Sequence, residues 1–202
     1  MTTNAISLVV GDHEALDAVS DELGGRGDDV VRVPAHDQNS WTAACSLDVG
    51  DRSVQTLVIG GAVDPGGRSA VRALELIRAL EPVLQTDGGR VVLLSGRDYL
   101  GWPGRAAAAA DLAGTVALGR SLALELGPRG ITVNVVCPPA DLGLLEATED
   151  PWEAPPPPLT GPVGPDDIAY AVGFLSHPDS GYITGQVVHV SGGLSVLSSL
   201  SA

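Results

Sequence analysis

The sequence predicts an α/β domain built on a doubly wound parallel sheet, and two observations support that prediction. Short runs of Val, Ile and Leu recur along the 202 residues, and most are separated by stretches with helical periodicity. Apolar residues predominate through most of each run, which is typical of strands covered by helices on both faces. Strands and helices that alternate in this way form the doubly wound, Rossmann-type architecture.

The first half of the chain is expected to supply three strands. Their residues are rich in Val, Ile and Leu, and Pro34 ends the second of them because proline cannot donate to a strand ladder. Asp12 is the expected N-cap of the first helix. In chain order we expect strand Ile6–Val10, helix Asp12–Leu23, strand Asp29–Val33, helix Ser40–Leu47 and strand Gln55–Ile59.

The second half continues the alternation of helices and strands. In chain order we expect helix Arg68–Leu84, strand Arg90–Leu94, helix Arg105–Leu126, strand Ile131–Val136, helix Pro165–Leu175 and strand Gln186–Val190. Residues 1–202 are enough for one domain and short for two. The stretch Ala154–Pro162 contains four consecutive prolines, and we expect a stiff surface loop there and no domain boundary.

Composition excludes several classes of function. The net charge is −14, which suits neither nucleic acid nor an anionic membrane. Cys45 and Cys137 lack metal-site spacing, and the four histidines are scattered, so no metal site is expected. No apolar run is judged long enough to span a bilayer, and no basic-then-apolar signal opens the chain, so a cytoplasmic location is expected.

From residue 88 onward the sequence resembles the short-chain dehydrogenase/reductase family. The second and third of the segments that carry the resemblance are close to diagnostic. These segments are Gly88–Ser95, Arg120–Asn134 and Tyr182–Gly193. The resemblance covers roughly residues 5 to 196, and the chain is shorter than usual around the second and third strands and in the substrate loop.

The resemblance implies a Ser, a Tyr and a Lys that carry out acid–base chemistry, usually with an Asn. Ser95 falls at the serine position. The tyrosine position is Ala108, and the lysine position, one helical turn later, is Leu112. Because the chain contains no lysine, and because Tyr99 lies only four residues after Ser95, the proton donor and its activating cation are missing. The asparagine position falls near Ser69.

The expected dinucleotide site is also altered. The family places a glycine-rich turn before the first helix, where the backbone approaches the pyrophosphate. Here only Gly11 remains, and Asp12, Glu14 and Asp17 place negative charge in that region. Gly60-Gly61-Ala62 and Pro138-Pro139 replace other cofactor contacts. We therefore expect no bound cofactor, whereas NAD(P) is required if the chain is a working oxidoreductase.

Surfaces that the family uses for assembly are kept. In helix Arg68–Leu84 one apolar stripe runs through Val71, Leu74, Ile77, Leu80 and Leu84, and a second through Ala73, Leu76 and Val83. The resemblance implies oligomer contacts through this helix, the following one and the C-terminal strand. The interface candidates are Val71, Leu74, Ala107, Val116, Tyr182 and Val188.

These observations favour a catalytically inactive member of the family that stabilises or tunes an active reductase subunit. Three alternatives stay open. The first is an NAD(P)-dependent oxidoreductase of the 3-oxoacyl or ketone reductase type with an unusual active site. The second is a homo-oligomeric protein that binds an apolar ligand in a cleft lined by Ala108, Leu112 and the proline-rich loop. The third is a regulatory or structural module unrelated to reductases.

Overall fold

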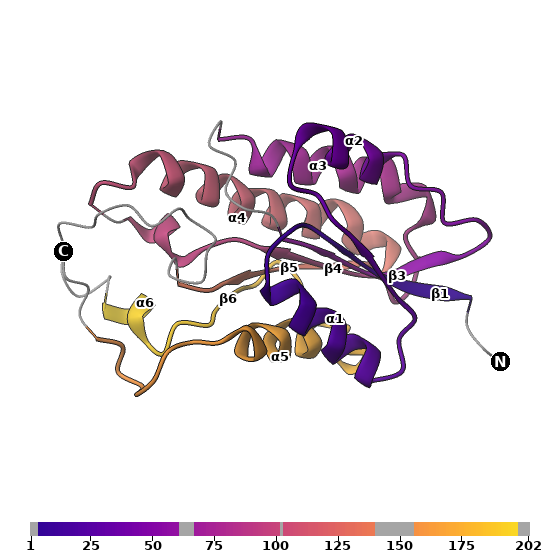
Figure 1. The fold of residues 1–202 in the computed structure, drawn as a ribbon. Coiled ribbons are helices and arrows are strands. Elements are labelled where there is room, and N and C mark those ends of the chain that lie inside the picture. Colours follow the sequence, from indigo (N-terminus) through magenta and orange to yellow (C-terminus); the bar gives the residue numbers. More distant parts are fainter. Residues whose placement is uncertain (1–3, 61–66, 102, 140–155, 198–202) are drawn as a thin grey trace.

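The computed structural model describes residues 4–60, 67–101, 103–139 and 156–197 (Figure 1). In these residues six strands form one sheet in the order β2-β1-β3-β4-β5-β6, and every neighbouring pair is parallel. The strands are β1 (Ala5–Val10), β2 (Val30–Val33), β3 (Ser53–Ile59), β4 (Arg90–Leu94), β5 (Thr132–Cys137) and β6 (Val187–His189). This confirms the predicted parallel sheet, with strand bounds that differ from the expected ones by two residues or fewer.

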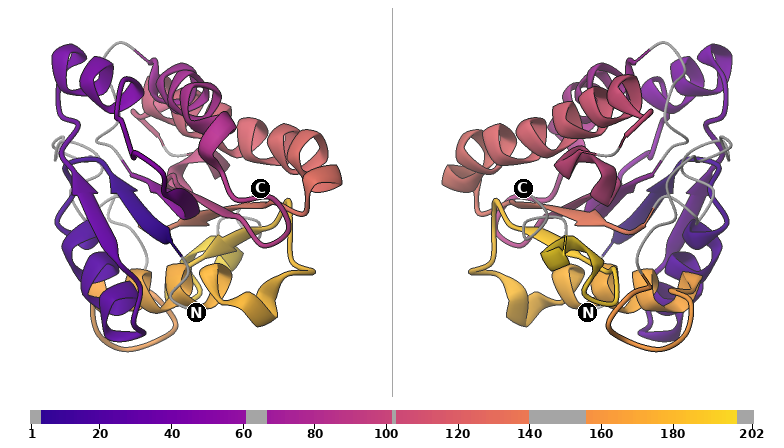
Figure 2. Two further views of the ribbon diagram at one scale, coloured as in Figure 1. Left: turned by 90° about the vertical axis from the view of Figure 1, so that its right-hand side faces the viewer. Right: turned by 90° about the vertical axis from the view of Figure 1, so that its left-hand side faces the viewer.

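Helices cover both faces of the sheet, as Figure 2 shows. One face packs against α2 (Gln38–Cys45), α3 (Ser69–Leu80) and α4 (Ala106–Leu126), and the other against α1 (Ala15–Gly25) and α5 (Pro165–Ser176). Short 3-10 turns follow several elements, and a last short helix, α6 (Leu194–Leu197), follows β6. Each face has its own apolar core, built mainly from Val, Leu, Ile and Ala.

Helix α3 is shorter than expected. It ends at Leu80, and Glu81–Val83 form a 3-10 turn that contains Pro82, which cannot donate the hydrogen bond that would continue the helix. Its buried residues are Ala73, Leu76, Ile77 and Leu80, two from each predicted stripe, so the inward face lies between the two stripes.

Helix α4 is apolar around much of its circumference. Among the described residues, α4 together with the 3-10 turn that follows it, Ala106–Arg129, is long and apolar enough to cross a membrane by length and composition. The sequence had led us to expect no such stretch. Its contacts account for that composition, because α4 packs between β5 on one side and α3 on another. The apolarity of this helix therefore matches a place in the core of the domain.

A glycine sets the distance between α4 and the sheet. A Cβ added at Gly119 would lie 2.5 Å from Cγ2 of Val135 on β5, and Gly119 is buried. Any side chain here must push α4 away from β5 or displace a tightly packed valine. The close approach of α4 to the carboxyl half of the sheet thus depends on this position.

We expect Gly119→Ala to lower the free energy of unfolding by about 1–3 kcal/mol, because the added methyl group overpacks the contact between α4 and β5. The matched control is Gly25→Ala, since a Cβ at this helical glycine meets nothing within 4 Å. The control should change stability by less than about 1 kcal/mol, and in the stabilising direction. Urea denaturation of both variants measures the difference, and equal effects would contradict the assigned packing.

Candidate functional site

The carboxyl ends of β4, β5 and β6 meet at one edge of the sheet, where ligands bind in open α/β sheets. Ser95 follows β4 directly, and Cys137 and His189 end β5 and β6. Ser95 is 2% exposed, and its hydroxyl donates to the backbone carbonyl oxygen of Leu112 at 3.0 Å. The single retained member of the expected catalytic set is therefore hydrogen-bonded to the backbone of α4.

Leu112 fills the space next to Ser95. Its side chain is 4% exposed, and a Cβ added at Gly96 would lie 3.1 Å from its Cδ1 atom. Ala108, one helical turn earlier, is half-buried. The prediction that Leu112 lines an open cleft with Ala108 is therefore wrong, because the Leu112 side chain is buried against the backbone that follows β4.

A carboxylate that the sequence did not reveal holds α4 to α3. Asp111 is buried, its Oδ1 atom accepts from the backbone nitrogen of Ser69 at 2.9 Å, and its Oδ2 atom accepts from the Ser69 hydroxyl. A carboxylate at a helix N-terminus satisfies unpaired amides and interacts favourably with the helix dipole. Ser69, expected near the asparagine position, thus serves to join two helices.

Tyr99 and His189 form an aromatic pair at this edge. Their ring centroids lie 5.6 Å apart and the ring planes differ by 14°. Burial, followed by the negative charge that Cys137 would carry, raises the pKa of Tyr99, whereas burial, followed by the positive charge of Arg97, lowers the pKa of His189. Both rings are therefore neutral near pH 7, and Tyr99 lacks the lowered pKa that the family's acid–base tyrosine requires.

Buried charges brace the same edge. Asp98 is 3% exposed and accepts from Nη1 of Arg105 at 2.8 Å, and Nη1 of Arg97 lies 3.8 Å from its other carboxylate oxygen. The backbone nitrogen of Arg97 donates to the carbonyl oxygen of Pro138. Pairing offsets the desolvation of these groups, and it ties the 3-10 turn Arg97–Leu100 to the start of α4. Sequence reasoning had missed this ion-pair network.

At the dinucleotide end of the sheet, Gly11 has a structural reason to be glycine. Its φ is +137°, and a Cβ would lie 1.3 Å from the carbonyl oxygen of Gly60. The nitrogen of Gly60 in turn donates to the carbonyl oxygen of Val10. The close approach of the backbones that follow β1 and β3 therefore requires glycine here without any ligand. Of the neighbouring glycine-rich segment, Gly61 and Ala62 lie outside the described residues.

The N-terminus of α1 is capped from within the chain. The nitrogen of Ala15 donates to Nδ1 of His13 at 3.1 Å, and the His13 side chain is buried. The helix begins three residues after Asp12, which is exposed, so the expected Asp12 cap is wrong. The imidazole thus accepts a hydrogen bond from one of the helix N-terminal amides to which a pyrophosphate would bind.

Charges around this helix end complete the test of whether a dinucleotide fits. Asp12, Glu14 and Asp17 are all exposed. Arg32 lies nearby, but its Nη1 atom donates to the Gly11 carbonyl oxygen at 2.6 Å and its Nε atom lies 3.4 Å from Asp17. A bound pyrophosphate would face carboxylates, with one helix amide and the nearby cation already bonded. These residues do not fit the usual dinucleotide site.

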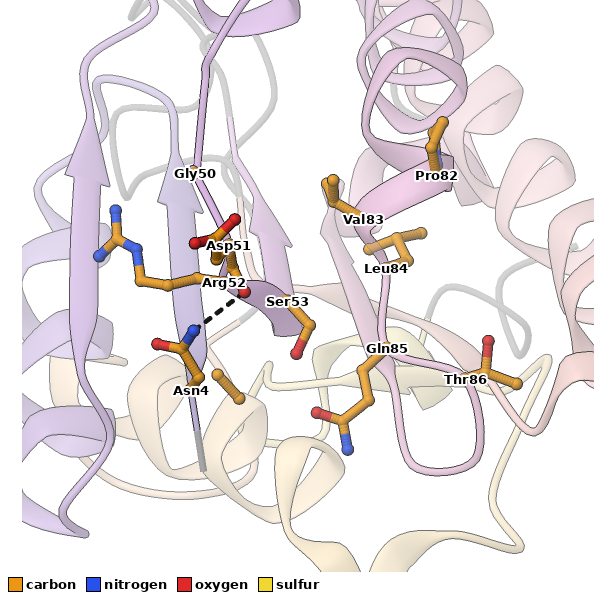
Figure 3. Close-up of a pocket in the computed structure, with 11 residues that line it drawn as sticks. Asn4, Gly50, Asp51, Arg52, Ser53, Pro82, Val83, Leu84, Gln85 and Thr86 are labelled. Atoms are coloured by element: carbon orange, nitrogen blue, oxygen red, sulfur yellow. Dashed lines mark hydrogen bonds between the residues drawn. The ribbon is translucent and has the colours of Figure 1, made fainter. Parts of the chain in front are cut away.

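Grooves occur elsewhere on the molecule. Figure 3 shows one at the amino ends of β1 and β3, at the opposite edge of the sheet from Ser95; Asn4, Arg52 and Gln85 are among its lining residues. A second lies between α1 and α5. Within the described part of the chain, no three His, Cys, Asp or Glu side chains gather as a metal site would require.

The structure separates the six interface candidates. Val71 is 48% exposed, Ala107 and Tyr182 are also exposed, and Leu74 and Val188 are half-buried. Val116, in contrast, is 4% exposed and belongs to the core beneath α4. Its expected place at an interface is therefore wrong, because this side of α4 faces the sheet.

Comparison with known proteins gives a consistent result. Residues 68–195 match the family described as enoyl-(acyl carrier protein) reductase. The chain is 32% identical over 223 residues to subunit BbsC of (2S)-[(R)-hydroxy(phenyl)methyl]succinyl-CoA dehydrogenase from Thauera aromatica, covering 97% of this chain and 86% of that protein.

Two other relatives match over a shorter stretch. Subunit BbsD of the same dehydrogenase is 39% identical, covering 56% of this chain and 48% of that subunit. The 3-oxoacyl-[acyl-carrier-protein] reductase FabG of Rickettsia prowazekii is 36% identical, covering 57% of this chain and 50% of that enzyme. The chain thus spans about half the length of each of these two relatives.

Solved structures share the fold. A dehydrogenase/reductase from Sinorhizobium meliloti superposes with a TM-score of 0.69 at 25% identity, covering 93% of this chain and 84% of that one. A short-chain dehydrogenase/reductase from Serratia marcescens gives a TM-score of 0.68 at 22% identity, covering 96% of this chain and 98% of that one. Because each superposition covers more than four fifths of both chains, these structures share the fold of this chain.

Burial controls the reactivity of the thiol at this edge. It raises the pKa of Cys137 to about 12, with a hydrogen bond involving Ser95 acting in the opposite direction. Burial, followed by the charge of Glu75, also raises the pKa of the half-buried Cys45. Because the thiolate is the reactive form, Cys137 should be inert in the folded protein at about pH 8.

We therefore expect a disulfide reagent such as DTNB to modify Cys45 slowly and Cys137 only after unfolding. The Cys45→Ser variant isolates the buried thiol, and it should release no chromophore until guanidinium is added. Rapid labelling of the folded Cys45→Ser protein would show that the edge of the sheet opens to solvent.

Proposed function

The chain belongs to the short-chain dehydrogenase/reductase family, and we propose that it is a non-catalytic member that stabilises or tunes an active reductase subunit. The observation that carries the proposal is the packing of Leu112. The side chain stands at the family's lysine position and lies against Gly96, and the backbone carbonyl oxygen of Leu112 accepts from the Ser95 hydroxyl. An aliphatic side chain there supplies neither the charge nor the proton donor of acid–base chemistry.

Other side chains at this edge do not replace the missing donor. Tyr99 stacks on His189, and its raised pKa makes it a poor source of the phenolate that proton exchange requires. Ser95 donates to backbone, and Cys137 has a pKa of about 12. Each group is held in its neutral, hydrogen-bonded or stacked form, which supports a structural role.

The proposal extends to the cofactor. His13 accepts a hydrogen bond from an amide at the N-terminus of α1, and the exposed residues Asp12, Glu14 and Asp17 lie just before this helix or in its first turn. A nicotinamide dinucleotide would have to displace a buried imidazole and approach three carboxylates. Both requirements oppose binding, so we propose that NAD(P) does not bind in the family's usual manner.

Assembly with an active relative is supported by the names of two similar proteins. BbsC and BbsD are named as subunits of one dehydrogenase, and this chain is similar to both. The outer surface of α3 and α4 offers Val71, Ala107 and the 81% exposed Leu124. An apolar surface of this kind on two adjacent helices suits a subunit contact. The proposed partner is a family member with an intact Ser, Tyr and Lys, whose substrates would include acyl thioesters or ketones.

Calorimetric titration with NAD(H) and NADP(H) tests the cofactor part of the proposal. We expect no saturable heat and no rise in melting temperature at about 1 mM cofactor. The variant Ala108→Tyr/Leu112→Lys restores the two missing side chains, and its fold is checked by circular dichroism. It should give no reduction of a 3-oxoacyl thioester, because the dinucleotide site stays altered. Micromolar affinity, or turnover by this variant, would instead favour an oxidoreductase with an unusual site.

The partner part requires reconstitution. We expect tagged protein from its own cells to co-purify with a family member that has the intact catalytic set, and the two recombinant chains to form a stable complex. The partner's reductase activity or melting temperature should rise when the chain is present. The Val71→Ser/Leu124→Ser variant should weaken the complex by at least about tenfold. The proposal would be overturned if the partner had the same activity and the same melting temperature with and without this chain.

A further inference from the structure

Strand β2 forms one edge of the described sheet, with β1 on its inner side. The nitrogen of Ser7 donates to the carbonyl oxygen of Asp29 at 2.9 Å, and the nitrogen of Gly11 donates to the carbonyl oxygen of Val33 at 3.0 Å. Successive residues of a strand direct their peptide groups to opposite sides. Every second residue from Asp29 to Val33 therefore faces β1, and the residues between them direct their peptide groups away from the sheet.

The outward residues of β2 are Val30 and Arg32. Within the described part of the chain, neither their backbone N–H groups nor their carbonyl oxygens have a hydrogen-bond partner, although the Arg32 guanidinium is bonded. An edge strand with unpaired backbone groups is a template on which a further strand can pair. Because β2 has four residues and Pro34 follows it, an added strand would make about four backbone hydrogen bonds.

Apolar side chains lie on both faces of this edge. Val31 and Val33 pack on the core beneath α2, α3 and α4, and Val30 packs on the core beneath α1 and α5. All residues of β2 are half-buried, so their side chains are only partly covered from the outer side. A strand added next to β2 would extend both apolar layers, and its central residues should therefore be aliphatic or β-branched.

Carboxylates lie at both ends of β2. Asp29 precedes the strand, and its side chain is 69% exposed, with Oδ2 at 3.7 Å from Nη1 of Arg52. After the strand, exposed Asp12 and Asp37 lie beside His36, whose ring nitrogens are 4.0 Å and 3.9 Å from their carboxylate oxygens. A partner strand with Lys or Arg at its ends would complement these charges, whereas a second copy of the same edge would bring like charges together.

We propose that the outer edge of β2 binds an extended segment of another protein, with aliphatic residues at its centre and Lys or Arg at its ends. The segment joins the sheet as a further strand. Backbone hydrogen bonds to Val30 and Arg32 set its register, and the carboxylates at the two ends of β2 select for positive charge. This binding site is separate from the outer surface of α3 and α4 that is proposed for the reductase partner.

Fluorescence anisotropy with labelled peptides tests the binding. The probe is a peptide of about seven residues, with valine and threonine at its centre and lysines at both ends. We expect saturable binding with a Kd below about 100 µM at about 0.15 M salt. A peptide with glutamate in place of lysine should not bind. A peptide with proline in place of the central residues keeps its charge but loses N–H groups, so it should bind at least about tenfold more weakly.

Amide hydrogen exchange, followed by NMR, locates the bound lysine peptide on the unmodified chain. Binding should slow the exchange of the Val30 and Arg32 amides at least about tenfold, because these N–H groups gain a partner. The amides of Val31 and Val33 face β1 already and should change much less. A peptide held only by the acidic surface would not produce this alternation along β2.

A charge variant tests the end of the edge. Asp29→Lys should weaken binding of the lysine peptide at least about threefold. The matched control is Asp179→Lys, which changes the net charge equally at a 92% exposed side chain after α5 and should leave the Kd unchanged. Melting temperatures check that both variants are folded.

Several results would overturn the proposal: no saturable binding, equal binding of the proline peptide, equal weakening by both variants, or no protection of Val30 and Arg32. Protection that instead grows with the concentration of the chain alone would assign the edge to a second copy and would also overturn it. Because none of these measurements involves a cofactor or a reductase, such a result would leave the proposed role beside an active reductase untouched.

Discussion

The contact between Leu112 and the backbone that follows β4 is the constraint on which the carboxyl edge of the sheet depends. The side chain packs against Gly96 while the leucine carbonyl oxygen takes the Ser95 hydroxyl. A lysine in its place would need a charged or polar partner in this buried position. With leucine there, the edge is stabilised by packing, and the neighbouring thiol, phenol and imidazole all remain uncharged.

Periodicity and composition were sufficient to predict the order of the elements. The strands are short and rich in Val, Ile and Leu, so each was predicted to within two residues. The inward face of α4 was harder to predict, because a helix that is apolar around its circumference has no single apolar stripe. Val116 was therefore assigned to the wrong face, and Pro82 ended α3 earlier than the apolar pattern suggested.

The sequence was sufficient to predict that tyrosine and lysine are absent from the family's two positions. It was less informative about the contacts that the other residues of the site make. The family's spacing, counted from Ser95, identified Ala108 and Leu112 as the tyrosine and lysine positions, and both residues lie on the same helix. Ser69 and Asp111 are 42 residues apart, and their hydrogen bonds depend on how two helices pack. The pairing of Asp98 with Arg105 and the stacking of Tyr99 on His189 likewise arise only after the chain has folded. Local sequence patterns carry no direct signal for such partners.

The imidazole cap of α1 has a consequence for the stability of the protein. A protein that binds a ligand in its folded state gains stability as the ligand concentration rises above its Kd. Here a ring from the chain itself already accepts a hydrogen bond from the Ala15 amide at the helix end. If NAD(P) does not bind there, as we propose, the free energy of unfolding stays the same at every nicotinamide concentration.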